Sequence, residues 1–281
     1  MKPIIYLDGR FMRADKKFLL SLTPGVLKAK GCFETMRVYQ KKIFVYERHM
    51  RRMKAGLKRL HISPPISSAQ LKTIVRTLLA MNKLNHARLR MMVWQKMKMV
   101  HTAVVVMPLD TPSAQKYKEG YVLCVSSTLL TKTRYSSFKT LDYQTMRRAL
   151  QQARKKSCDE ALLLNQKGFL VEGAHTNIFF VKDKILYTPA LLAGCLDGVT
   201  RRLVIQSARK LGVTVREGQW KLQALLSADE AFITNTLLGI MPLNSINYQT
   251  KINFKTGSIT HKLYSAYKRV FDSDISKQRL N

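Results

Sequence analysis

The pattern of apolar and polar residues divides the chain into short strands and amphipathic helices. Over residues 47–60, apolar side chains recur every three or four positions, which is typical of a helix with one buried face. Pro64-Pro65 then stops the chain, and Ser67 or Ser68 can cap a second helix that runs to about Asn82. Further helices are predicted over 143–157, 200–211, 220–227 and 262–271.

Strands are predicted where β-branched and aromatic residues cluster between turn residues. Ile4–Leu7 and Arg10–Met12 are expected to form a hairpin around Asp8-Gly9, and Cys32–Tyr39 a second hairpin with Ile43–Val45. Other strands are expected over 88–93, 102–107, 121–126, 161–165, 168–171, 178–181, 185–187, 213–217 and 231–234. Strands and helices mix without a repeat or a strict alternation, so we expect a mixed α/β (α+β) fold.

A polar stretch from Pro108 to Gly120 is predicted to link two domains. The chain has 281 residues, which is long enough for two hydrophobic cores. We therefore expect a small N-terminal α/β domain over residues 1–112 and a larger C-terminal domain over residues 113–281.

Composition narrows the environment in which the chain is expected to act. No apolar run reaches the length of about 18 residues that a membrane span needs, and the polar start of the chain does not resemble a signal peptide. The four cysteines lack metal-type spacing, so we expect reduced thiols, no metal site and a cytoplasmic location. These cysteines are Cys32, Cys124, Cys158 and Cys195.

The charge is unusual, with 49 basic residues against 17 acidic residues and a net charge of +32. Such a field favours anionic partners, including nucleic acids. However, the basic residues are spread along amphipathic patterns, and the chain has no aromatic RNA-binding motif, zinc finger or separate basic tail. We therefore do not expect nucleic-acid binding as the main role, and we expect an anionic small molecule as the ligand.

One lysine is a candidate for covalent chemistry. Lys139 lies in the segment Ser137–Tyr143, and Glu172 and Asn177 follow it downstream. A lysine amine can form an imine with an aldehyde cofactor such as pyridoxal 5'-phosphate (PLP). PLP also needs an acidic partner at its ring nitrogen and a cradle for its phosphate. Glu172 could be that partner, although a lysine alone is most simply a surface charge.

Three segments have residues suited to binding a phosphate. Leu196–Arg201 is a glycine turn that opens a helix, where free N–H groups and the helix dipole attract anions. Phe232–Thr236 ends a predicted strand in small hydroxyl and amide side chains. Arg52, at the predicted start of a helix, could reach the same anion. Taken singly, each is also compatible with an ordinary cap, turn or solvated arginine.

The order of these residues resembles that of the class-IV aminotransferases (PLP fold type IV), and the resemblance runs from about Tyr6 to about Leu243. It implies PLP as the cofactor, two domains and a homodimer. It also implies that Lys139 carries the cofactor and that Glu172 binds the pyridine nitrogen. By motif position the phosphate would be held by Arg52, Val199, Thr200 and Thr236.

Within this family, residues 31–38 and 234–242 resemble those of the 4-amino-4-deoxychorismate lyases. That resemblance implies a lyase that releases 4-aminobenzoate and pyruvate, with Thr35 as a candidate proton donor to the leaving group. The alternative is an aminotransferase for a branched-chain or D-amino acid. Arg37 and Arg90 are candidates for binding the substrate carboxylate.

The chain also departs from the family pattern. Lysines, including Lys28, replace a usual tyrosine and aspartate before Gly31, and the turn after the strand at 88–93 lacks the usual arginine. Lys28, Lys96 or Lys98 could take over that role, or the substrate could differ. A third hypothesis is a basic binding protein that has kept an enzyme fold, but the retention of both Lys139 and Glu172 argues against it.

Overall fold

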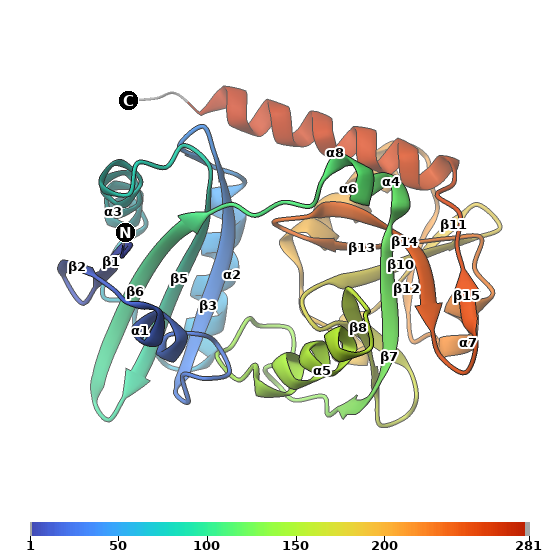
Figure 1. Ribbon diagram of the computed structural model, residues 1–281, viewed down its shortest axis with the longest axis horizontal. Helices are drawn as coiled ribbons and strands as arrows, with labels where there is room; N and C mark the ends of the chain where they lie inside the picture. The colour runs from blue at the N-terminus through green and yellow to red at the C-terminus, as the bar shows by residue number, and fades with distance from the viewer. Residues whose placement is uncertain (1, 279–281) are drawn as a thin grey trace. The chain divides into compact units, whose positions relative to one another are not determined.

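The computed structural model of the chain describes residues 2–278. They form two compact units (Figure 1). The first contains residues 2–110, the segment Phe138–Gln144 and residues 271–278. The second contains Thr111–Ser137 and Thr145–Val270. The first unit thus takes in a short internal segment, and that segment carries Lys139.

The first unit is built on an antiparallel sheet with the strand order β2-β1-β6-β5-β3-β4. The Asp8-Gly9 hairpin and the hairpin that follows Tyr39 are both confirmed. Asp8 and Gly9 have φ angles of 46° and 92°, as a tight two-residue hairpin turn requires. The strands are β1 (Ile4–Leu7), β2 (Arg10–Arg13), β3 (Lys30–Tyr39), β4 (Lys42–Ile43), β5 (Ala87–Lys96) and β6 (Met99–Pro108).

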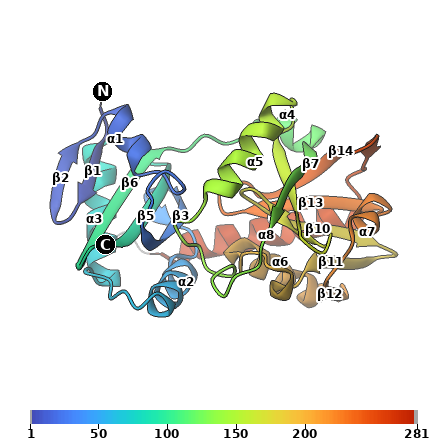
Figure 2. The same ribbon diagram turned by 90° about the horizontal axis from the view of Figure 1, so that it is seen from below.

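Helices cover both faces of this sheet, and Figure 2 shows α1 and α2 on opposite sides of its strands. The helices α2 (Tyr46–Arg59) and α3 (Ser68–Met81) pack on one face. A reciprocal capping box between Ser67 and Gln70 begins α3, as the sequence predicts. The short helix α1 (Lys16–Ser21) lies on the other face, beside an apolar cluster that contains Phe33.

The second unit contains a mixed sheet that, within residues 2–278, has the strand order β12-β11-β10-β13-β14-β7-β8-β9, with β15 paired to β14. Three pairs are parallel (β11–β12, β14–β7 and β7–β8), and the rest are antiparallel. The strands are β7 (Tyr121–Leu130), β8 (Glu160–Asn165), β9 (Leu170–Gly173), β10 (Asn177–Lys182), β11 (Ile185–Pro189), β12 (Val215–Gly218), β13 (Glu230–Asn235), β14 (Gly239–Asn247) and β15 (Lys251–Asn253).

The remaining helices are α4 (Ala114–Glu119), α5 (Gln144–Lys155), the 3-10 turn η1 (Leu191–Ala193), α6 (Val199–Lys210), α7 (Leu222–Leu226) and α8 (Ser258–Lys277). The predicted link over 108–120 contains α4, which Ser113 caps. Among the described residues, no helix has an apolar stretch of the length that a membrane crossing demands. The mixed α/β character expected from the sequence is confirmed.

One expectation about the cysteines is wrong. Cys124 and Cys158 form a disulfide, with their Cα atoms 5.9 Å apart, whereas Cys32 and Cys195 are buried free thiols. Cys124 lies on β7 and Cys158 just precedes β8, and these two strands are neighbours in the sheet. The two cysteines are 34 positions apart in sequence, so their spacing carried no signal of this contact.

We predict that replacing both Cys124 and Cys158 by alanine lowers the free energy of unfolding, by about 4 kcal/mol if loop-closure entropy alone decides. Denaturant titration of wild type and variant measures the difference. Cys195→Ala is the matched control, because it removes a buried thiol without opening a cross-link. An equal loss in the control and the double variant, or alkylation of all four cysteines in the denatured, unreduced protein, would contradict the disulfide.

Candidate active site

The segment around Lys139 is held by backbone hydrogen bonds to the start of β3. The Phe33 N–H donates to the Lys139 carbonyl at 2.9 Å, and the Leu141 N–H donates to the Gly31 carbonyl at 3.0 Å. On the other side, the Gly25 N–H donates to the Leu141 carbonyl at 2.9 Å. Gly25 has a φ of 81°, and a Cβ there would lie 2.7 Å from the Tyr143 backbone, so only glycine fits. The position of Lys139 is therefore fixed from both sides.

The Lys139 amine lies against two aromatic rings. Its Nζ is 4.6 Å from the centre of the Phe33 ring and 5.0 Å from that of Tyr143. It also donates to the Tyr143 Oη at 3.4 Å. The two rings meet edge to face, with their centres 5.2 Å apart. This half-buried amine is restrained in position and close to a second polar group, as a reactive lysine needs to be.

A buried network of charged and polar side chains surrounds Glu34, on the face of β3 opposite to Phe33. Arg52 donates to both Glu34 oxygens, through Nε and Nη2, at 2.7 Å each. His49 Nδ1 lies 2.7 Å from Glu34 Oε2. Burial raises the pKa of Glu34, but the Arg52 charge and the hydrogen bonds from Arg52 and His49 outweigh it and lower the pKa to about 2. Burial lowers the pKa of His49, so His49 donates as a neutral imidazole.

This network corrects the expected position of Arg52. Arg52 lies in the middle of α2, and not at the start of a helix. Its guanidinium is fixed by Glu34 in a bidentate pair, which restrains a side chain that would otherwise be flexible. Arg52 and Lys139 both belong to the first unit, whereas Glu172, Val199, Thr200 and Thr236 belong to the second.

In the second unit, Glu172 is a buried carboxylate at the end of β9. Its Oε2 accepts from Asn177 Nδ2 at 3.2 Å and from the Leu196 N–H at 3.0 Å. A Cβ at Gly198 would lie 2.0 Å from Asn177 Oδ1, so glycine lets the turn at 196–198 approach Asn177. The structure thus brings together Glu172, Asn177 and the turn that precedes α6.

The N-terminus of α6 has the features of an anion site. Gly198 occupies the cap position, and no side chain caps the helix. Arg201 anchors this first turn, because its Nη2 donates to the Pro189 carbonyl and to Glu217, each at 2.8 Å. Thr200 is 3% exposed, and its buried hydroxyl has no hydrogen-bond partner among residues 2–278. A buried hydroxyl beside free helix N–H groups can bind a phosphate oxygen.

The strand end at β13 supplies further small polar groups. Asn235 Oδ1 accepts from the N–H groups of Leu237 and Leu238, and the tight turn that results contains Thr236. The buried Thr234 hydroxyl has no hydrogen-bond partner within the described part of the chain. The residues therefore fit PLP on three counts: an amine at Lys139, a buried carboxylate at Glu172, and phosphate-type donors at Thr200 and its neighbours.

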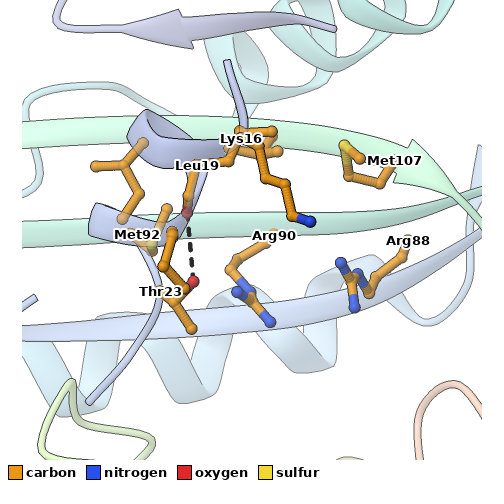
Figure 3. A pocket seen from close by; sticks show the side chains of 10 residues that line it. Lys16, Leu19, Thr23, Arg88, Arg90, Met92 and Met107 are labelled. Carbon is orange, nitrogen blue, oxygen red and sulfur yellow. Dashed lines mark hydrogen bonds between the residues drawn. The ribbon is translucent and has the colours of Figure 1, made fainter. Parts of the chain in front are cut away.

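The residues predicted to act on the substrate do not all lie in one place. Thr35 and Arg90 are direct partners across β3 and β5. Arg90 lines a pocket beside α1, together with Lys16 and Arg88 (Figure 3). Arg37 is not among the residues that line it, and its guanidinium lies 4.9 Å from the centre of the Phe271 ring.

Sequence reasoning missed several groups that shape the site. Phe33, Tyr143, Glu34 and His49 were not singled out, although Tyr143 follows Lys139 by only four positions. The alternation along β3 was the available signal, because it sends Phe33 and Thr35 to one face and Glu34 to the other. The contact of Glu34 with Arg52 joins a strand to a helix and had no local signature.

Comparison with known proteins identifies the family. The sequence profile described as amino-transferase class IV matches residues 31–246, which is more than half of the chain. The chain belongs to the class-IV aminotransferase family. The predicted family, its fold and its PLP dependence are thereby confirmed, and the chain is a PLP-dependent enzyme.

Relatives within the family catalyse different reactions. The chain is 30% identical over 280 residues to the aminodeoxychorismate lyase of Bacillus subtilis, covering 95% of this chain and 94% of that protein. It is 31% identical over 275 residues to a Methanocaldococcus jannaschii protein provisionally named a branched-chain-amino-acid aminotransferase, covering 95% and 96%.

Among solved structures, the branched-chain aminotransferase of Thermoproteus uzoniensis, solved with norvaline, superposes with a TM-score of 0.83 at 27% identity, covering 97% of this chain and 96% of that one. The family therefore includes a lyase and aminotransferases. Membership alone does not identify the reaction of this chain, so the reaction has to be inferred from the residues of the site.

We predict that Glu34→Gln lowers the stability at neutral pH by roughly 3 kcal/mol, since a buried pair loses one charge. The depressed pKa means that the contribution of Glu34 is present above pH 4.5 and is lost as the pH falls from there toward about 2. Denaturant unfolding from pH 7 to pH 3 measures this. Wild type should lose stability more steeply than the variant, and parallel curves would contradict the network.

We predict that Thr200→Val weakens PLP binding roughly tenfold or more, because a hydrogen bond to a charged phosphate oxygen is lost. Titration of the apoprotein with PLP, followed by visible absorbance, gives the dissociation constant. Thr260→Val is the matched control, because Thr260 on α8 also has a buried hydroxyl without a partner among residues 2–278. Equal affinities of the two variants would rule out a phosphate contact at Thr200.

Proposed function

We propose that this enzyme is a lyase that converts 4-amino-4-deoxychorismate into 4-aminobenzoate and pyruvate. The observation that carries the proposal is the position of Thr35. It lies two residues from Phe33 on the same face of β3, and the Phe33 ring contacts the Lys139 amine. A lyase needs a proton donor for its leaving group beside the reactive lysine, and an aminotransferase does not. Similarity to the Bacillus subtilis lyase supports the same choice.

In this proposal PLP is bound by the residues that the sequence predicts for it. Lys139 would hold the cofactor aldehyde, and Glu172 would pair with the pyridine nitrogen. Val199 and Thr200 would donate to the phosphate from the start of α6, and Thr236 and Arg52 would complete its ligands. When bound, PLP supplies a sink for the electrons of the substrate carbon next to the amine.

The side chains of this chain would move two protons. The Lys139 amine removes the proton from the ring carbon that bears the substrate amine. The C–O bond to the enolpyruvyl group then breaks, the ring becomes aromatic, and Thr35 protonates the methylene carbon of the leaving group to give pyruvate. Glu172, held by Asn177 and the Leu196 N–H, would accept a hydrogen bond from the pyridine nitrogen.

The second candidate function is an aminotransferase for a branched-chain or D-amino acid. The Methanocaldococcus jannaschii relative and the Thermoproteus uzoniensis structure favour it. It requires a 2-oxo acid as amino acceptor, whereas the lyase does not. A homodimer is part of both proposals, and light scattering after size-exclusion chromatography measures the mass of the particle.

We predict that Thr35→Val lowers the rate of pyruvate release about a hundredfold or more, which is the usual effect of losing a general acid. Thr35→Ser, which keeps the hydroxyl, should retain most of the activity and serves as the control. Coupled assay of pyruvate measures the rate, and visible absorbance before and after borohydride checks that PLP is still bound through Lys139. Equal loss in both variants would count against Thr35 as the proton donor.

A further inference from the structure

A cavity of about 260 Å³ lies between α1 and the strands β5 and β6 of the first unit (Figure 3). Its walls are mostly apolar, and Thr23 is held at its edge by a hydrogen bond to the Leu19 carbonyl at 3.3 Å. The lining includes Lys16, Arg88, Arg90, Met92, Val105 and Met107.

Three of the lining residues are cations, and none is acidic. In Figure 3 the Lys16 amine and the guanidinium groups of Arg88 and Arg90 point into one region of the pocket. Among residues 2–278, neither Lys16 nor Arg88 forms an ion pair. Lys16 and Arg88 are exposed and Arg90 is half-buried, so the three cations form a positive rim on a mostly apolar pocket, and such a rim attracts an anion.

The apolar walls restrict the kind of anion. Met92, Val105 and Met107 present carbon and sulfur, which suit an apolar ring or chain and not a small, fully hydrated ion. A carboxylate attached to a hydrophobic body satisfies both parts of the pocket, because planar guanidinium groups match carboxylate geometry.

The pocket and the reactive lysine share one face of the sheet. Phe33 pairs with Met92, and Thr35 pairs with Arg90, across β3 and β5. The centre of the Phe33 ring lies 4.6 Å from Lys139 Nζ and 6.0 Å from the Arg90 guanidinium carbon. Lys139 and Arg90 thus both lie near the Phe33 ring, and we expect a ligand with a single six-membered ring to place its amine toward Lys139 and its carboxylate toward the three cations.

We propose that Lys16, Arg88 and Arg90 form the site for the ring carboxylate of the substrate, with Lys16 and Arg88 as residues that determine specificity. This inference rests on the proposed lyase function only for the identity of the ligand. The product, 4-aminobenzoate, keeps the ring carboxylate, so it binds the same three cations. 4-Aminobenzamide has the same shape without the charge, and it does not.

The test uses the PLP-loaded protein with the variants Lys16→Gln and Arg88→Gln. Each is expected to weaken 4-aminobenzoate binding, measured by calorimetry, and to raise the KM for 4-amino-4-deoxychorismate, by about three- to tenfold. The kcat should stay within about twofold, and the absorbance of bound PLP should not change. Lys17→Gln is the matched control, because Lys17 lies on the same helix but does not line the pocket.

Three results would overturn the proposal. One is an equal loss in Lys17→Gln and Lys16→Gln, because general charge would then explain the binding. Another is tight binding of 4-aminobenzamide. The third is inorganic phosphate competing as strongly as 4-aminobenzoate through Lys16, which would make the pocket a phosphate site.

The proposed function can fail separately from the pocket. Wild-type protein that does not turn over 4-amino-4-deoxychorismate would sink the lyase. If 4-aminobenzoate still bound in a manner that depends on Lys16 and Arg88, the carboxylate site would stand without it.

Discussion

The hydrogen bonds between the Lys139 segment and the first residues of β3 are the constraint that positions the candidate site residues of the first unit. One hydrogen bond, from the Phe33 N–H to the Lys139 carbonyl, fixes the lysine backbone and its distance to the Phe33 ring together. The same strand then carries Thr35 on that face and Glu34 on the other, where Glu34 fixes Arg52. A change of one residue in register would exchange these faces and move Phe33 and Thr35 away from Lys139, and Glu34 away from Arg52.

Two kinds of electrostatic environment follow from the two faces of β3. Behind the strand, Glu34 is surrounded by donors and stays ionised, so the positive charge of Arg52 is compensated and its geometry is fixed. In front of it, Lys16, Arg88 and Arg90 gather around a cavity whose lining has no acidic residue. The ion pair with Glu34 restrains Arg52, whereas the cationic lining of the cavity attracts an anion.

Local chemistry made much of this structure predictable. The capping box at Ser67 and the Asp8-Gly9 turn each depend on residues close together in the sequence. The order of the predicted cofactor-binding residues indicated the family. Strand β14 was not predicted; it contains Pro242, a residue that is unfavourable in a central strand but pairs here with Phe232. The disulfide, the contact of Arg52 with Glu34 and the inclusion of Phe138–Gln144 in the first unit all join distant parts of the chain, so no local pattern signals them.

The most direct test of the proposed reaction is a product analysis with purified PLP-loaded protein and 4-amino-4-deoxychorismate, in the absence of any 2-oxo acid. We predict that 4-aminobenzoate and pyruvate form in equal amounts over many turnovers, and that Lys139→Ala forms neither. Product formation that occurs only after a 2-oxo acid is added, with an amino acid as the second product, would contradict it and favour an aminotransferase.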